Sequence, residues 1–396
     1  MVDTATRRWL IVAGLGTSQT LAWASSYYLI AILAPAMARD TGTSSMAVFA
    51  AFSASLLISA LLGPRVGRTI DSIGGREVLA ISNLVFAAGL GILAVAPSFP
   101  LLAVGWLVMG LGMGLGLYDA AFAALGRIYG HQARASITGI TLLAGFASTV
   151  GWPLTAWGDA TLGWRGTCAA WAIAHVAIGL PLNLLILPRL RHTTNTGAQA
   201  EAPHVPMDRA MWLLGFAFAA GWIVSTAMAA HLPRLLEAAG ASTAQAIAAA
   251  ALVGPAQVAA RVLEAGLLSR YHPLVSARLS TLTHPVGAGL LLLGGGWLAA
   301  PFTLLHGAGN GILTIARGTV PLAVFGPENY GYRLGLIGAP ARILQAGAPI
   351  AFGALIDHFG AYALLCSSGA CVLATWALLA VQIAPQAVVE NQGAER

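Results

Sequence analysis

Three charged side chains stand inside long apolar runs of this 396-residue chain: Asp119, Arg317 and Arg342. A charge inside hydrocarbon is costly, so ionisable residues in such runs generally face a cavity and mark a pathway. A buried carboxyl such as Asp119 can bind and release a proton, which suits proton coupling. Arg342 stays charged and can bind a carboxylate through two nitrogens, which suits an anionic ligand. Alternatively, Asp119 is the permanent partner of one arginine, and the sequence leaves open which of the two.

Polar residues accompany both arginines. His306, Asn310 and Arg317 follow one another at offsets of 4 and 7 residues, which places them on one face of a helix. Gln345 lies one turn from Arg342. An apolar helix has little structural reason to align such side chains, so we expect them to line a cavity. The alternative is hydrogen bonding between packed helices.

A third polar stripe lies in the first apolar run, where Gln19, Trp23 and Tyr27 recur every four residues. This spacing places an amide and two aromatic rings on one helical face. Aromatic rings at such positions also serve simply for packing. We predict these substrate-binding residues: Gln19, Tyr27, His306, Asn310, Arg317, Arg342 and Gln345, with Asp119 for proton coupling.

The sequence gives no sign of an enzyme. It has no Ser, His and Asp constellation, no metal-binding histidine cluster and no glycine-rich phosphate loop. The three cysteines, Cys168, Cys366 and Cys371, show neither metal spacing nor a disulfide pattern. We therefore expect no catalytic residue, no metal and no cofactor, and a proton gradient as the driving force.

Composition defines the class of protein. Hydrophobic residues make up 58% of the chain and charged residues 9%, against roughly 25% charged in soluble proteins. Apolar runs near 20 residues recur, and such a run can cross a bilayer. We predict an all-α membrane protein with twelve transmembrane helices, at 9–37, 46–65, 78–97, 100–126, 135–157, 165–187, 210–232, 243–264, 276–294, 299–324, 334–356 and 361–384.

The arginines predict the orientation. The net charge of +6 comes from 20 basic residues, all of them Arg, and it does not indicate nucleic-acid binding. With twelve spans, fourteen arginines fall on the side of the N-terminus and only Arg39, Arg165 and Arg234 on the other. Basic residues accumulate in cytoplasmic loops, so we expect both termini in the cytoplasm.

The two halves of the chain repeat each other. Residues 110–114 (GLGMG) are echoed by 307–311 (GAGNG), and residues 67–71 (GRTID) by 260–264 (ARVLE). The one long polar segment, 188–209, lies between the halves. We therefore predict two pseudo-symmetric six-helix bundles, 1–187 and 210–396, joined by a cytoplasmic linker.

The loop after the second predicted span carries a family signature. Residues 67–76 read GRTIDSIGGR, which resembles the Gly-x-x-x-Asp-(Arg/Lys)-x-Gly-(Arg/Lys)-(Arg/Lys) loop of the major facilitator superfamily. Four positions of that pattern match, whereas Ser72 and Gly75 replace basic residues; the matches are Gly67, Asp71, Gly74 and Arg76.

The resemblance implies a two-bundle fold in a bacterial inner membrane, and a cytoplasmic latch that stabilises the outward-facing state. Asp71 could form a charge-assisted bond with an arginine or cap a neighbouring helix. We assign Gly67, Asp71 and Arg76 to this cytoplasmic gate. Arg261 and Glu264, which occupy the equivalent place in the second half, would form a structural or latch pair. For Asp71, the alternative to a latch is a fixed interfacial ion pair.

These features predict a transporter of a small organic solute, an anion such as a carboxylate, that works by proton-coupled alternating access. The alternative is a proton-driven efflux antiporter for drugs, toxic metabolites or metalloid oxyanions. The expected partners are the small-molecule substrate and the lipid bilayer, with no nucleic acid, and we expect the monomer to function.

Overall fold

The computed structural model describes residues 4–190 and 205–382, and within these ranges the regular elements are all helices. The segment before the linker contains α1 (Thr4–Ser25), α2 (Leu29–Asp40), α3 (Ser45–Ile73), α4 (Gly75–Val95), α5 (Phe99–Gly116), α6 (Tyr118–Tyr129), α7 (Arg134–Ala144), α8 (Ala147–Ala174) and α9 (Leu180–Ile186). The segment after it contains α10 (Arg209–Ala238), α11 (Thr243–Ala250), α12 (Val253–Gly266), α13 (Pro273–Gly294), α14 (Ala299–Phe325), α15 (Tyr330–Phe359) and α16 (Ala363–Leu379).

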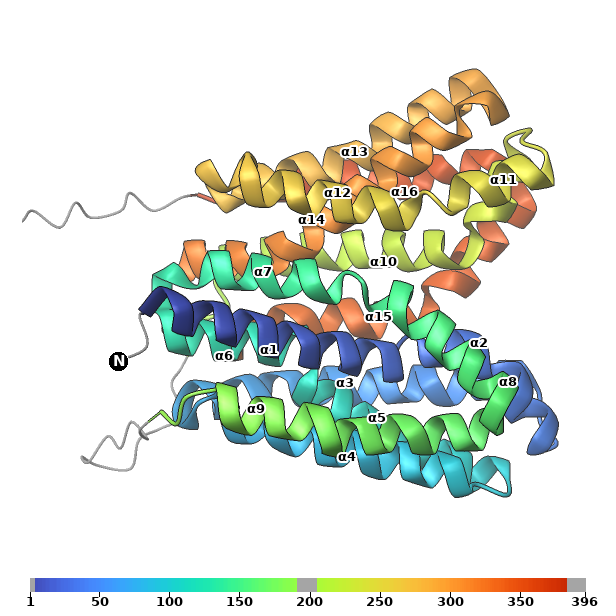
Figure 1. Ribbon diagram of the computed structural model, residues 1–396. Coiled ribbons are helices and arrows are strands. Elements are labelled where there is room, and N and C mark those ends of the chain that lie inside the picture. The colour runs from blue at the N-terminus through green and yellow to red at the C-terminus, as the bar shows by residue number, and fades with distance from the viewer. Residues whose placement is uncertain (1–3, 191–204, 383–396) are drawn as a thin grey trace, which may run out of the picture.

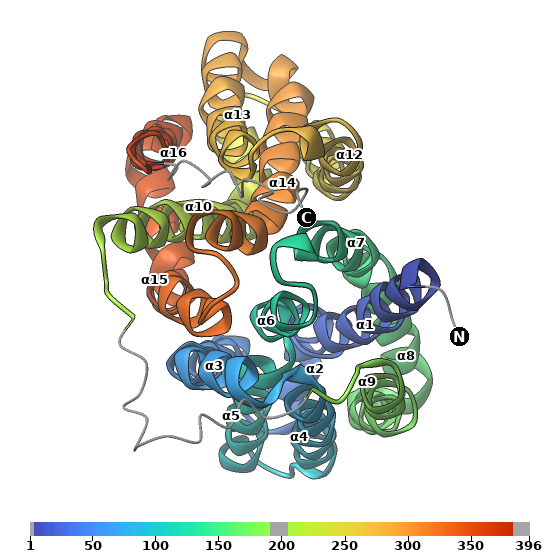
Figure 2. The ribbon, with the colours of Figure 1, turned by 90° about the vertical axis from the view of Figure 1, so that its left-hand side faces the viewer.

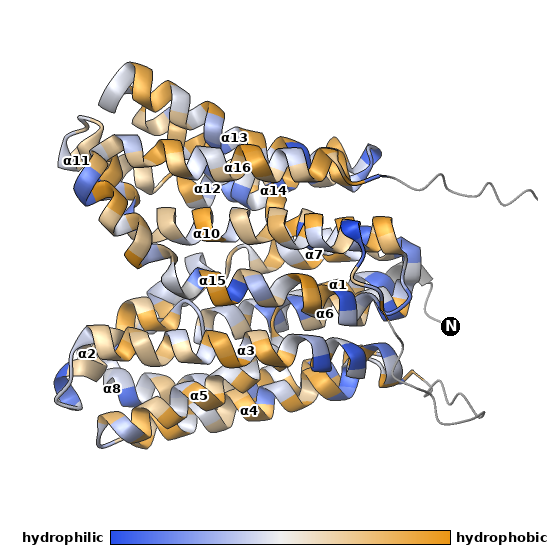
Figure 3. Cartoon of the chain, turned by 180° about the vertical axis from the view of Figure 1, so that it is seen from behind, coloured by the Kyte–Doolittle hydropathy of each residue, from blue (hydrophilic) through white to orange (hydrophobic). Residues whose placement is uncertain are grey.

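Eight continuous helical stretches of the described chain are long and apolar enough to cross a membrane. The two longest have 88 and 53 residues, whereas one crossing needs about 20. Both contain sharp turns, at Gly163 and at Gly295, where φ is +68° and +60°. Glycine reaches such angles without steric cost. Figure 3 shows mostly hydrophobic colour along the helices and hydrophilic residues gathered near their ends.

The helices form two groups, α1 to α9 and α10 to α16 (Figure 2). The start of α1, the end of α9, the start of α10 and the end of α16 all lie at one end of the molecule (Figure 1). We call it the linker end. The opposite end is called the far end. Most of the predicted linker 188–209 falls on residues 191–204, which lie outside the described residues.

The two groups touch closely toward the linker end, where α3 lies against α15. A Cβ atom on Gly67 would lie 2.0 Å from the carbonyl oxygen of Gly331, so these backbones are in direct contact. One turn further along, a Cβ on Gly335 would lie 2.4 Å from the carbonyl carbon of Gly63. Small residues allow membrane helices to approach this closely. The groups diverge toward the far end (Figure 1).

One internal contact recurs in both groups. Arg76 on α4 donates from Nε and Nη2 to the carbonyl of Leu184 on α9, at 2.8 and 2.6 Å. Arg278 on α13 donates from the same two atoms to the carbonyl of Leu378 on α16, at 3.2 and 3.0 Å. Each arginine satisfies a carbonyl near the linker end of its own group. The two groups therefore share this arginine-to-carbonyl contact.

Candidate substrate and coupling site

The three embedded charges of the sequence meet in one cluster between the groups. Arg317 on α14 and Arg342 on α15 both donate through Nη2 to Oδ2 of Asp119 on α6, at 2.7 and 2.5 Å. All three side chains are nearly buried, with 6%, 13% and 10% of their surfaces exposed. Asp119 pairs with both arginines, which answers the question that the sequence left open. The cluster carries one excess positive charge.

A break in the fourth predicted span positions the carboxylate. Helix α5 ends at Gly116, Leu117 is extended, and α6 begins at Tyr118. Asp119 therefore stands in the first turn of α6, where the helix dipole favours a negative charge. Gln19 donates from Nε2 to the carbonyl oxygen of Gly116 at 2.6 Å. The amide thus supplies a partner for a carbonyl at the break.

Several neighbours hold the two guanidinium groups in place. The Arg317 guanidinium lies over the ring of Trp222, 4.9 Å from its centroid. Arg342 donates from Nη1 to Oγ of Ser59 at 3.2 Å, which is a second contact between the groups. A Cβ on Gly338 would lie 2.9 Å from Nη2 of Arg317, so glycine leaves room for the ion pair. Spacing within the sequence indicated neither Ser59 nor Gly338.

Aromatic rings at the end of α1 form a cluster that packs against Tyr118, the residue before Asp119. The rings of Trp23 and Tyr118 lie 5.0 Å apart, and those of Trp23 and Tyr27 5.5 Å apart. Gln345 on α15 donates from Nε2 to the hydroxyl of Tyr27 at 3.1 Å, which joins the two groups again. Gln19, Tyr27 and Gln345 therefore lie in the same central region as Asp119.

His306 and Asn310 lie elsewhere, although they share α14 with Arg317. They line a small cavity inside the second group, together with residues of α10, α13 and α16. Nδ1 of His306 is 3.0 Å from Nδ1 of His284, and Asn310 accepts a hydrogen bond of 2.7 Å from Ser225. Arg317 is not among the residues that line this cavity. The helical stripe read in the sequence therefore spans two separate environments.

At the linker end, Asp71 holds the groups together through the backbone. Its two carboxylate oxygens accept hydrogen bonds from the N–H groups of Gly331 and Tyr332, at 2.9 and 2.8 Å. These amides lie in the first turn of α15, where unpaired N–H groups and the helix dipole attract an anion. Arg68 adds a contact over the ring of Tyr332. Of the predicted gate residues, Gly67 and Asp71 join the groups, whereas Arg76 acts within the first group.

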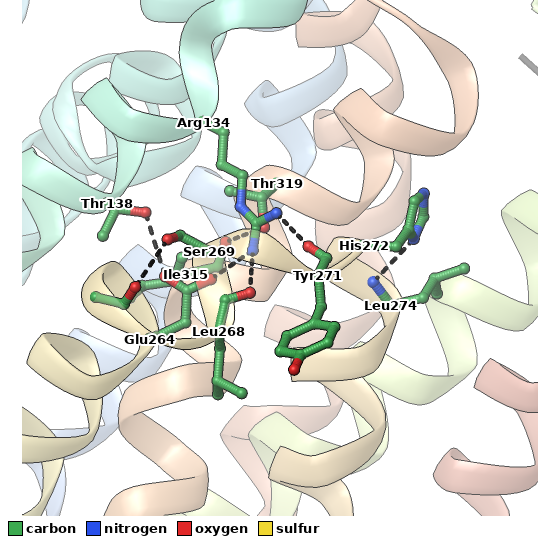
Figure 4. A network of polar contacts seen from close by, with 11 residues as sticks. Arg134, Thr138, Glu264, Leu268, Ser269, Tyr271, His272, Leu274, Ile315 and Thr319 are labelled. Carbon is green, nitrogen blue, oxygen red and sulfur yellow. Dashed lines mark hydrogen bonds and ion pairs between the residues drawn. The ribbon is translucent and has the colours of Figure 1, made fainter.

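Glu264 makes the equivalent contact on the other side of the molecule. It accepts from Nη2 of Arg134 at 3.0 Å, and Arg134 also donates to the carbonyls of Tyr271 and Leu268, at 2.5 and 3.1 Å (Figure 4). The hydroxyl of Thr138 is 3.5 Å from Glu264. Arg134 is not among the gate residues that the sequence predicts. The similarity of the two halves could have indicated it. Helix α7 of the first group donates to Glu264 of the second, as α15 of the second group donates to Asp71 of the first.

Arg261 does not pair with Glu264, contrary to the expectation of a latch pair. It donates from Nη1 to the carbonyl of Thr141 at 3.2 Å, and from Nε to the carbonyl of Gly311 at 3.4 Å. The expectation was wrong because residues three apart on one helix were free to find separate partners on α7 and α14. Arg261 is buried, with 6% of its surface exposed.

An all-helical, apolar body whose two groups meet around a buried ion cluster defines a membrane transporter. The sequence profile described as Major Facilitator Superfamily matches residues 15–304. The chain therefore belongs to this superfamily, as the loop at residues 67–76 suggested, and it is a multi-pass membrane transporter.

Two curated proteins are similar in sequence. An uncharacterized 38 kDa protein in the 23S RNA operon of Thermoproteus tenax is 27% identical over 95% of this chain and 96% of its own length. A probable polyol transporter 4 of Arabidopsis thaliana is 46% identical over 67 residues, which are 17% of this chain and 13% of the plant protein.

Solved structures share the fold. The human organic anion transporter MFSD10 has a TM-score of 0.72 at 15% identity, covering 94% of this chain and 99% of its own. FucP in its outward conformation, also described as the E. coli fucose:proton symporter, has a TM-score of 0.72 at 15% identity, covering 93% and 97%. The proton:xylose symporter XylE has a TM-score of 0.69 at 16% identity, covering 94% and 95%. At these identities the likeness establishes the fold alone.

Proposed function

We propose that this protein moves a small organic anion across the membrane by proton-coupled alternating access. The observation that carries the proposal is the shared carboxylate: Asp119, from the first group, neutralises one of the two guanidinium groups that Arg317 and Arg342 bring from the second. An anion in this cluster would meet a positive excess. The human protein of the same fold is described as an organic anion transporter.

The cluster suggests how proton and anion would be coupled. Asp119 and its arginines belong to different groups, so the ion pairs must break when the groups move apart. A proton on Asp119 would remove its charge and release both guanidinium groups. A carboxylate substrate could then take the place of Asp119 and bind Arg342 through two nitrogens. Loss of the proton would restore the original pairs and expel the anion.

The proposal includes the number of membrane spans, the orientation of the protein and the state that the structure represents. The two longest stretches cover the fourth to sixth and the ninth and tenth predicted spans, and the last stretch covers the end of the eleventh and most of the twelfth. These lengths support the proposal of twelve spans in two six-helix bundles. The linker end would face the cytoplasm, because basic residues concentrate in cytoplasmic loops. The contacts of Gly67, Asp71 and Glu264 then make this a state closed to the cytoplasm. FucP, which is similar in fold, is described in the outward conformation. We propose that the monomer, in a bacterial inner membrane, is the functional unit.

Flux in proteoliposomes with an imposed pH gradient tests the proposal. The parent protein should accumulate a radiolabelled small carboxylate against its gradient when the proton gradient is present. Asp119→Asn, which mimics the protonated side chain, should still exchange substrate across the membrane but should not accumulate it. Arg342→Gln should lower both exchange and binding by about tenfold or more, since it removes a charged hydrogen-bond donor.

Asp40→Asn is the matched control. Asp40 pairs with Arg165 at 2.6 Å, but this pair is partly exposed and lies within the first group at the far end. The control should transport like the parent. Accumulation that survives in Asp119→Asn, or that ignores the pH gradient in the parent, would exclude Asp119 as the coupling group.

The aromatic rings around Trp23 favour a second candidate, which is proton-driven efflux of an apolar or weakly polar compound. Trp23, Tyr27 and Tyr118 form tilted and edge-on ring pairs, and Tyr118 directly precedes Asp119 in the chain. Such a surface can bind flat hydrophobic molecules. Here the proton on Asp119 would exchange for cargo rather than accompany it. Efflux predicts that an inward proton gradient expels an aromatic dye from vesicles, and that Arg342→Gln leaves dye binding unchanged.

A further inference from the structure

Arg261 is a buried cation without an acidic partner. Among the described residues, no carboxylate lies within 4 Å of its guanidinium, whereas Arg317 and Arg342 share Asp119. The contacts of Arg261 are two backbone carbonyls, those of Thr141 and Gly311. Carbonyl dipoles solvate a cation but leave its charge in place, and a buried charge that is not neutralised is costly.

The local structure makes room for this guanidinium. Helix α7 ends at Ala144 and α8 begins at Ala147, so the fifth predicted span is interrupted beside α12. A Cβ on Gly145, inside the interruption, would lie 2.1 Å from Nη1 of Arg261. The carbonyls at the end of α7 carry the negative end of a helix dipole and hold the cation there.

Arg261 reaches from α12 toward the level of the central cluster, because its two partner carbonyls lie on either side of that level. Counted along α14, Gly311 lies roughly 21 Å from the linker end, and counted along α7, Thr141 lies roughly 10 Å from it. Asp119 lies between them, roughly 15 Å along α6. Helix α14 carries both the Gly311 carbonyl, which Arg261 contacts, and Arg317, which belongs to the central cluster. One helix therefore contacts Arg261 and also contributes to the cluster. Figure 2 shows α12 and α14 beside α7.

We propose that the substrate is a divalent anion, and that Arg261 receives one of its two negative charges while the Arg317–Arg342 pair receives the other. Among the described residues, Arg261, Arg317 and Arg342 bring three guanidinium groups against the single carboxylate of Asp119, so two positive charges are in excess while Asp119 is ionised. Two negative charges on the ligand balance these two, and when Asp119 is protonated a dianion still leaves less excess charge than a monoanion does. This inference rests on the proposed anion transport. It adds the number of negative charges on the substrate and names Arg261 as the residue that binds the second charge.

The test compares anions of matched shape and different charge. Malonate, succinate and glutarate, each with its monomethyl ester, are titrated calorimetrically into the purified full-length protein in mildly alkaline buffer, where both carboxyls are ionised. At least one dicarboxylate should bind about tenfold or more tightly than its half-ester, because the second carboxylate gains a charge-assisted bond. In Arg261→Gln, the dicarboxylate and its half-ester should bind with nearly equal affinity.

Two further variants complete the test. Arg278→Gln removes an arginine that binds the Leu378 carbonyl within the second group, and it should keep the preference for the dianion. If Arg261→Gln is not recovered folded, Arg261→Lys takes its place. It keeps a point charge but loses the two-nitrogen bond to a carboxylate, so it should retain only part of the preference, and the parent's full preference in that variant would overturn the role of Arg261.

Each adverse result has a distinct meaning. A preference for the dianion that persists in Arg261→Gln overturns the role of Arg261. Equal affinities for dicarboxylate and half-ester in the parent overturn the divalent substrate but leave anion transport standing. Binding of neither, in parent and variants alike, rejects anion transport and this inference together.

Discussion

Gly67 is the position where one methyl group should shift the balance between the two states of the molecule. The Cβ of Gly67→Ala would lie 2.0 Å from the oxygen and 2.2 Å from the carbon of the Gly331 carbonyl, and 2.7 Å from the nitrogen of Tyr332. All three are backbone atoms, so no side-chain rotation relieves the overlap. Helices α3 and α15 must separate by about 1 Å or more, since unbonded heavy atoms need more than 3 Å.

The separation also strains the contact of Asp71. Its hydrogen bonds to Gly331 and Tyr332 join the same two helix segments. Overpacking costs about 1–3 kcal/mol, and each bond to a charged group contributes about 1.5–3 kcal/mol. With partial relaxation, the state closed at the linker end should lose about 2–4 kcal/mol. Its population relative to the state open at that end should then fall roughly 30- to 1000-fold.

Distances between spin labels across the linker end measure this population. Labels on Thr69→Cys and Glu328→Cys, both exposed and on opposite groups, report the separation after Cys366→Ser removes the exposed native thiol. The parent should show one short distance, and Gly67→Ala should add or favour a longer one.

Gly91→Ala is the control for this experiment, because Gly91 also lies in a helix and nothing lies within 4 Å of its added Cβ. Alanine favours an isolated helix over glycine by about 1 kcal/mol, so the control should be neutral or more stable. A Gly67→Ala protein with the parent's distance distribution would refute the claim that α3 and α15 set the closed state.

Three further substitutions test other parts of the structure. Glu264→Gln removes the acid that accepts from Arg134, and the same labels should report a fall of about tenfold or more in the closed state, whereas no change would make this ion pair structural only. Gly338→Ala places a Cβ 2.9 Å from Arg317 and 3.2 Å from Asp119, so transport against the substrate gradient should be lost, as in Asp119→Asn. The control is Gly347→Ala on the same helix, whose added Cβ has nothing within 4 Å and which should transport normally. Gln19→Leu leaves the Gly116 carbonyl at the break in the fourth span without its hydrogen-bond donor. The loss costs about 1–3 kcal/mol and should lower the midpoint of thermal unfolding. The control is Thr17→Val, whose hydroxyl is exposed, and equal midpoints for the two variants would show that the carbonyl finds another donor.

The charged residues of the central site could be found from the sequence because the membrane makes them conspicuous. Asp119, Arg317 and Arg342 interrupt apolar runs, and no packing requirement explains a charge there. Their pairing could not be decided, because Asp119 lies about two hundred residues from both arginines along the chain. Only the contact between α6, α14 and α15 brings both arginines to one oxygen.

The helical stripe of α14 shows the limit of periodicity. His306, Asn310 and Arg317 do share one helix, yet His306 meets His284 inside the second group while Arg317 meets Asp119 between the groups. Periodicity gives the direction of a side chain from its own helix axis. It does not say which neighbouring helix lies in that direction at each level.

The sequence by itself determined the class of this protein, its apolar helices and its repeat, because these depend on local composition and on spacing along one chain. It also marked the loop of Gly67 and Asp71, since a backbone contact and a helix cap each require a particular residue type. The tertiary structure alone decided that Glu264 meets Arg134, that two arginines share one carboxylate, and that Arg261 lies among carbonyls with no acid within 4 Å in the part of the chain that the structure describes. Those facts depend on which helices face each other across the two groups, and packing between distant segments fixes that choice.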